Sequence, residues 1–262
     1  MKLSALAFAL ASTLSLAAPA GAVTIVSAGR VAFVSTFYDV SPLAFDSDTA
    51  GGGTRAFGPY LEAAVSSIGR GSSANVAAEA TQLSDFASVG TDGLSAQGSG
   101  AVGVAFDVAD PGRASRAEGT ADSALRIVFA IDTPSAYAFV VALEADLSEL
   151  SIVSGAGPAS AQFFAYAQLV GTTTGTLVNV RIEDRAADGV AVAHLETFSG
   201  VLAPDLYVLE VAASGLAGGF EDALGFGTGG FAFELRIARE SSAAMLFAVG
   251  LGLLLVSRSR RR

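Results

Sequence analysis

The feature that most constrains this chain is a series of short β-type runs, separated by turn residues, through residues 23–240. The runs are rich in β-branched and aromatic residues, which suit half-buried strands. Strands repeated roughly every 8–15 residues indicate an antiparallel β-sandwich. We expect one all-β sandwich of the jelly-roll type, flanked by an N-terminal signal helix and a C-terminal hydrophobic helix. The predicted strands cover residues 30–40, 101–108, 124–131, 137–143, 162–170, 176–183, 190–198, 205–211 and 230–237.

Other stretches of the same region have weaker strand signals. Residues 46–58 read as a loop because they contain Gly51-Gly52-Gly53, and residues 60–66 could form one or two helical turns. Two zones rich in Gly, Ala and Ser, residues 69–103 and 212–230, are expected to be loose hairpins or flexible loops. Ala and Gly bury little area, so these zones predict a poorly packed core. Within the second zone, residues 225–230 read as a Gly-rich hairpin.

Composition excludes several classes of site. The chain has no Cys, which excludes disulfides, a thiol nucleophile and Cys-ligated metals, and its single histidine excludes His-rich metal sites. Residues 23–240 contain 10 arginines, no lysine and 25 acidic residues, a net charge of about −15. This balance argues against nucleic acid as a partner and suits solubility outside a cell.

The N-terminus has the pattern of a secretory signal peptide. Lys2 is followed by an apolar stretch over residues 3–16, and Pro19 ends this stretch just before the small residues Ala20 and Ala22. We therefore expect signal peptidase to cleave after Ala22. Residues 1–22 would then be the signal peptide and 23–240 the exported domain.

The C-terminus has the pattern of a membrane tail over residues 241–262. Residues 243–256 carry no charge and would span roughly 21 Å as a helix, against a hydrocarbon core of about 30 Å. Flanking serines and snorkelling arginines can make up much of the difference. The arginines should stay in the cytoplasm and hold the domain outside. They are Arg258, Arg260, Arg261 and Arg262.

These ends resemble those of the PEP-CTERM proteins, bacterial surface proteins whose tails an exosortase recognises. Residues 198–209 are similar to the "G-x-L-x-P-G-x-Y-x-L" strand pair of that family, and residues 231–235 to its last strand before the tail. The Pro-Glu-Pro signature is reduced to Glu240, followed by Ser241 and Ser242. The resemblance implies an exosortase-like sorting enzyme as partner. A different sorting enzyme or a retained membrane anchor stays open.

Two groups of residues are candidates for catalysis. Alternation places His194 on one strand face with Val190, Val192 and Glu196. A solvent-facing or edge-strand position explains the histidine without catalysis. The acidic residues Glu183, Asp184 and Asp188 could serve a glycosidase, which needs two carboxylates facing one cleft. We instead interpret this acidic cluster as a charged hairpin end in solvent. The chain contains no G-x-S-x-G nucleophile motif.

Residues 46–51 contain a weak calcium-binding motif. Asp46 and Asp48 begin a D-x-D-x-x-G pattern, without the third acidic ligand or the closing glutamate of a calcium loop. The sequence thus predicts a non-enzymatic exported surface or extracellular-matrix protein without a cofactor, with surface polysaccharide as a further partner. The alternative is a carbohydrate- or calcium-binding module held by a retained anchor. A hydrolase using His194 or the acidic cluster is a third hypothesis.

Overall fold

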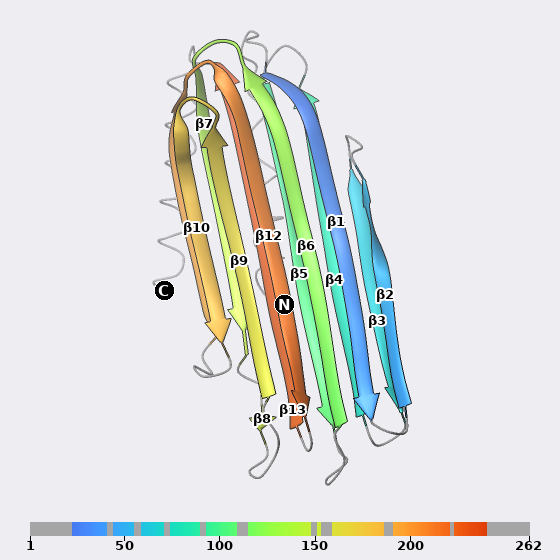
Figure 1. Cartoon of the computed structure of the whole chain (residues 1–262). Coiled ribbons are helices and arrows are strands. Elements are labelled where there is room, and N and C mark those ends of the chain that lie inside the picture. The colour runs from blue at the N-terminus through green and yellow to red at the C-terminus, as the bar shows by residue number, and fades with distance from the viewer. Residues whose placement is uncertain are drawn as a thin grey trace, which may run out of the picture.

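The chain folds into two packed antiparallel sheets (Figure 1). The computed structural model describes residues 23–40, 44–54, 59–70, 74–89, 93–108, 115–147, 151–152, 159–185, 191–220 and 223–239. Sheet A consists of β1 (Val23–Val40), β2 (Ala44–Thr54), β6 (Ser115–Ile131), β9 (Ala159–Gly171), β10 (Gly175–Arg185) and β12 (Asp205–Phe220). Sheet B consists of β3 (Tyr60–Arg70), β4 (Ala74–Val89), β5 (Gly93–Val108), β7 (Ser135–Asp146), β8 (Ser151–Ile152), β11 (Val192–Leu202) and β13 (Ala223–Arg239).

The two sheets run strand over strand. Sheet A has the order β10-β9-β12-β6-β1-β2, and sheet B the order β11-β7-β13-β5-β4-β3, with β8 beside β13. Across the interface β2 packs on β3, β1 on β4, β12 on β13 and β10 on β11. The predicted β-sandwich is therefore confirmed. The described residues form thirteen strands, more than the eight strands of a jelly roll.

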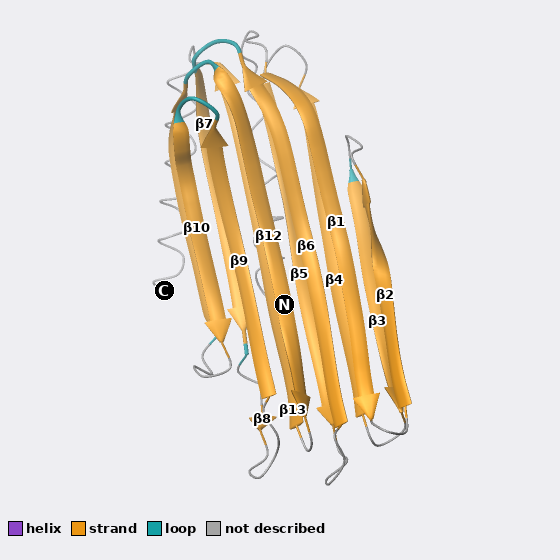
Figure 2. Cartoon of the chain, viewed as in Figure 1, coloured by secondary structure: helices purple, strands orange, loops and turns teal. Residues whose placement is uncertain are grey.

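Helices are absent from the residues that Figure 2 colours as described. None of these residues forms a helix with the length and apolarity to cross a membrane. The expected signal helix and C-terminal helix, residues 1–22 and 241–262, lie outside the described residues.

Eight of the nine predicted strands lie within observed ones, which extend further at one or both ends, and the ninth, residues 190–198, overlaps β11 from Val192 onward. The turn at residues 132–134 separates β6 from β7, and that at residues 172–174 separates β9 from β10, as predicted. Three predictions are wrong. Residues 60–66 belong to strand β3, residues 44–54 form strand β2 through the predicted loop, and residues 225–230 lie inside β13. Pairing with a neighbouring strand overrides the low strand propensity of Gly and Ala in each segment.

The expectation of a loose core in the Gly- and Ala-rich zones is also wrong. Phe163 of β9 is fully buried, and Gly215 of β12 and Gly227 of β13 lie against its ring. A Cβ atom would lie 2.1 Å from the ring at Gly215 and 2.4 Å at Gly227. The small residues therefore make room for aromatic rings, and the interior stays closely packed.

A tyrosine fixes the crossing from sheet B to sheet A between β11 and β12. The hydroxyl of the buried Tyr207 donates a hydrogen bond to the carbonyl of Ala203 (2.9 Å), four residues upstream. Its ring stacks on Phe129 of β6, with ring centroids 5.6 Å apart. This contact is similar to the tyrosine corner of other β-sandwiches. Residues 198–202 lie in β11 and residues 205–209 in β12, so the two strands of this segment belong to opposite sheets.

Candidate functional site

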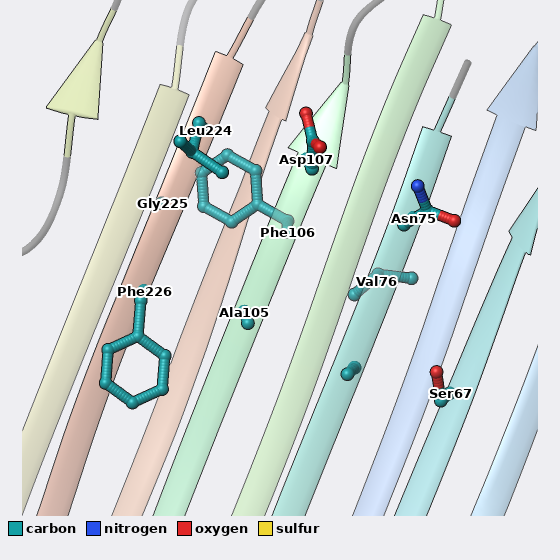
Figure 3. A pocket seen from close by; sticks show the side chains of 10 residues that line it. Ser67, Asn75, Val76, Ala105, Phe106, Asp107, Leu224, Gly225 and Phe226 are labelled. Atoms are coloured by element: carbon teal, nitrogen blue, oxygen red, sulfur yellow. The ribbon is translucent and has the colours of Figure 1, made fainter. Parts of the chain in front are cut away.

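A hollow of about 370 Å³ lies on the outer face of sheet B, near one end of β3, β4, β5 and β13 (Figure 3). The register of these strands explains its position. One row across the sheet runs from Ser67 through Ala77 and Ala105 to Phe226. Two alanines separate the serine from the phenylalanine ring. Because their side chains are short, the surface of the sheet is recessed in the middle of this row.

The next row provides the polar groups of the hollow. Asn75 pairs with Asp107, which in turn pairs with Leu224 of β13. An amide, a carboxylate and the hydroxyl of Ser67 therefore border the same hollow as two partly exposed apolar side chains, Leu224 and Phe226. Such a mixture can hydrogen-bond one edge of a small ligand while an apolar face packs on the ring.

Sequence reasoning did not find this hollow. Asn75 and Ala77 lie in the first zone interpreted as loosely ordered, and Leu224 and Phe226 in the second. Asp107 lies in a predicted strand but has no motif around it. The only local signal for this site is the alternation around residues 105–107. This pattern predicts a strand, but it does not predict which strands pair with it.

His194 lies on an edge strand, as predicted. It is on β11, one of the two edge strands of sheet B, and shares one face with Val192 and Glu196. Its Nε2 atom lies 2.7 Å from Oε1 of Glu196, and both side chains are about two-fifths exposed. This contact gives His194 a carboxylate partner on its own strand.

The acidic cluster divides between the two faces of β10. Glu183 lies on the outer face and accepts hydrogen bonds from Arg185 and Gln162, each at 2.5 Å. The bond from Arg185, and then the charges of the neighbouring arginines, lower the pKa of Glu183, while desolvation opposes this shift. Adjacent strand residues point to opposite faces, so Asp184 points away from Glu183 and into the core.

Asp184 corrects the prediction of a solvent-exposed cluster. Its side chain is buried, and its Oδ2 atom accepts a hydrogen bond from the backbone N–H of Leu147 (2.9 Å) at the end of β7. Its Oδ1 atom is also buried and has no hydrogen-bond partner among the residues that the structure describes. Glu183 and Asp184 therefore do not face a common cleft, and Asp188 lies outside the described residues.

The remaining sequence candidates are only partly described. Asp46 and Asp48 lie in β2, paired with Tyr38 and Thr36, so their backbone is an extended strand and not the predicted loop. Within the described part of the chain, no group of three or more His, Asp or Glu residues is placed to hold a metal. The signal and tail residues lie outside this part: Ala20, Ala22, Glu240, Ser241, Ser242, Arg258, Arg260, Arg261 and Arg262.

Asp205, which sequence reasoning also missed, binds the turn between β9 and β10. Its carboxylate accepts hydrogen bonds from the hydroxyl of Thr172 (2.6 Å) and the backbone N–H groups of Thr173 (2.9 Å) and Thr174 (3.0 Å). These bonds, that of Thr172 first, hold the pKa of Asp205 far below its usual range, while desolvation opposes them. Gly175, whose φ of 78° is left-handed, ends the turn.

We expect Asp205→Asn to lower the urea midpoint at neutral pH, because a neutral amide accepts these bonds more weakly. The folded-state pKa of Asp205 is depressed, so its contribution to stability is complete above the unfolded pKa of about 4 and is lost as the pH falls below it. Urea denaturation should be measured at neutral pH and near pH 3. The difference in urea midpoint between wild type and Asp205→Asn should be smaller at the acidic pH. Asp132→Asn, in an exposed turn, is the control. A difference independent of pH would contradict this origin.

Comparison with known proteins does not assign a family. No family model matches the chain, and no curated protein sequence matches it. A solved structure of carbohydrate-binding modules from the β-sandwich superfamily is 11% identical and covers 81% of this chain and 99% of its own, with a TM-score of 0.15. The structure of infectious bursal disease virus, Gx strain, is 11% identical and covers 90% of this chain and 74% of its own, with a TM-score of 0.18. The fold assignment therefore rests on the strand pairing of the chain itself.

Proposed function

We propose that this protein is a non-enzymatic, exported surface or extracellular-matrix protein, sorted through its C-terminal tail. The support for export and sorting comes from the sequence: a signal-like segment over residues 1–22 and a hydrophobic, arginine-ended segment over residues 241–262. Between them stands a β-sandwich with a strongly acidic composition, which suits a soluble domain outside the cell.

The structural observation that best supports a non-enzymatic role is the use made of the candidate catalytic residues. Asp184 holds the end of β7 to β10, Glu183 binds arginine on the opposite face, and His194 contacts Glu196 at a sheet edge. Each residue has a structural partner, and the two carboxylates of β10 point away from each other. This arrangement favours a scaffold over a hydrolase.

Deleting residues 241–262 tests the sorting proposal. The truncated protein should be released into the medium while the full chain stays with the cell surface, and replacing the four tail arginines with serine should impair sorting as well. Intact mass of the protein from its source then separates two forms of the proposal. A chain ending near Ser241 indicates a cleaved tail, and one ending at Arg262 a retained anchor. Unchanged surface location after deletion would refute the proposal.

The hollow on sheet B supports a second candidate function, a carbohydrate-binding surface module held by a retained anchor. A sugar ring has hydroxyl groups at its edge and an apolar face, which match Asn75 and Asp107 beside Phe226. Phe226→Ala and Asp107→Ala should each weaken binding to neutral oligosaccharides on a glycan array. Phe220→Ala, equally exposed on sheet A, is the matched control and should leave binding unchanged. No binding by the wild-type protein would refute this candidate.

Calcium binding is the other form of this second candidate, carried by Asp46 and Asp48. The two residues are two positions apart along β2. Calcium that binds only the folded protein must raise its melting temperature. The test is a calcium titration of the wild type and of Asp46→Asn/Asp48→Asn. A melting temperature independent of calcium would refute this form.

A further inference from the structure

The sandwich has two lateral edges with similar construction. β2 and β3 form one edge, and β10 and β11 form the other; among the described residues each of these strands pairs on one side only. All four strands are 11 residues long. None contains Pro or Lys, with which many proteins block pairing along an open edge.

The directions of the strands allow the two edges to meet. Six strands follow one another in sheet A, and six form the main path of sheet B, always antiparallel to their neighbours. With an even number of strands, β2 runs opposite to β10, and β3 runs opposite to β11. A second copy displaced sideways therefore places β2 antiparallel to β10 and β3 antiparallel to β11 at the same time.

Apolar side chains on the outer face of sheet B lie at both edges. On β3, Leu61 is 73% exposed and Val65 is 64% exposed, the two highest values among the large apolar residues described. On β11, Leu195 and Val201 are 49% and 50% exposed. Antiparallel pairing of β3 with β11 would bring these side chains together as cross-strand or diagonal neighbours and remove them from water.

We propose that copies of this chain assemble edge to edge, with β2 and β3 of one copy pairing with β10 and β11 of the next. Because the two surfaces are different, this contact does not close on itself and generates an open ribbon of two continuous sheets. The twist of the strands would turn the ribbon into a helical filament. The partner in each contact is a second copy of the chain. This proposal does not depend on the function proposed for the sorting tail.

A cysteine experiment tests this contact, since the chain has no cysteine of its own. The full chain carrying Val65→Cys and Leu195→Cys is treated, in mild detergent, with a bis-maleimide reagent spanning about 8 Å, the diagonal distance between cross-strand neighbours. Adjacent copies should be linked into a ladder of dimers, trimers and larger species on a denaturing gel. The matched control, Val65→Cys with Leu216→Cys, has its second thiol in the middle of sheet A.

The outcomes separate the possible contacts. The ribbon predicts about ten-fold more species beyond the dimer in the edge-to-edge variant than in the control, because neighbours hold their thiols at a high effective concentration. After the same treatment, each single-cysteine variant should run as a monomer on the denaturing gel. Dimers from Val65→Cys alone would indicate β3 pairing with β3 and overturn the ribbon. Equal ladders in variant and control, or no ladder in either, would also overturn it.

Discussion

Replacing Phe163 with alanine is expected to lower the free energy of unfolding by about 3–5 kcal/mol, the usual cost of removing a buried aromatic ring. The ring is fully buried between the sheets, with Gly215 and Gly227 against it. Neither glycine has a side chain that could move into the space, so a cavity should remain. Urea denaturation followed by far-ultraviolet circular dichroism measures the loss.

Phe164 is the matched control, one residue further along β9. Its side chain points to the outer face of sheet A, where it stacks beside Tyr166 and lies under the guanidinium of Arg181. Phe164→Ala leaves no cavity, so we expect a loss of about 1 kcal/mol or less. Similar losses for the two variants would contradict the assignment of Phe163 to the core.

The strands with strong alternation could be predicted from the sequence. In β6, Leu125, Ile127, Phe129 and Ile131 all face the core, and the turn after Ile131 has a proline. Large apolar residues at every second position determine a strand locally, because one face must be buried. Each such segment contains enough apolar area to indicate its own burial.

The strands made of small residues could not be predicted in this way. Gly100 of β5 is buried because the ring of Phe231, far along the chain, fills the space beside it. A glycine contributes no apolar area of its own, so its local sequence does not indicate burial. Only the pairing of β5 with β13, set by the whole sheet, brings the two residues together.

The candidate site was likewise predictable only in the parts that have a distinctive local sequence. The hollow on sheet B depends on the register of four strands, in which Ala77 and Ala105 fall side by side between larger neighbours. Neither alanine is distinctive in its own segment. The acidic cluster was visible in the sequence, but its interpretation required the face that each residue occupies. That face follows from the pairing of β10 with β9.

The most informative residue of that cluster is Asp184, and Asp184→Ala is expected to lower the free energy of unfolding by about 2–3 kcal/mol. The substitution would leave the N–H of Leu147 buried without its acceptor. An unsatisfied buried donor costs more than the average hydrogen bond contributes, because its lost hydration is not replaced. Urea denaturation of wild type and variant measures the change.

Two further variants separate the hydrogen bond from other effects of the substitution. Asp184→Asn keeps an oxygen that can accept the bond from Leu147 and should lose clearly less stability than Asp184→Ala. Glu183→Ala, on the outer face of the same strand, removes two exposed arginine pairs and the hydrogen bond from Gln162, and leaves no buried group without a partner, so it should cost less than Asp184→Ala. Hydrogen exchange at Leu147 should accelerate in Asp184→Ala and not in Glu183→Ala. Equal losses for Asp184→Ala and Glu183→Ala would contradict the structural role of this buried carboxylate, and its orientation would then need another explanation.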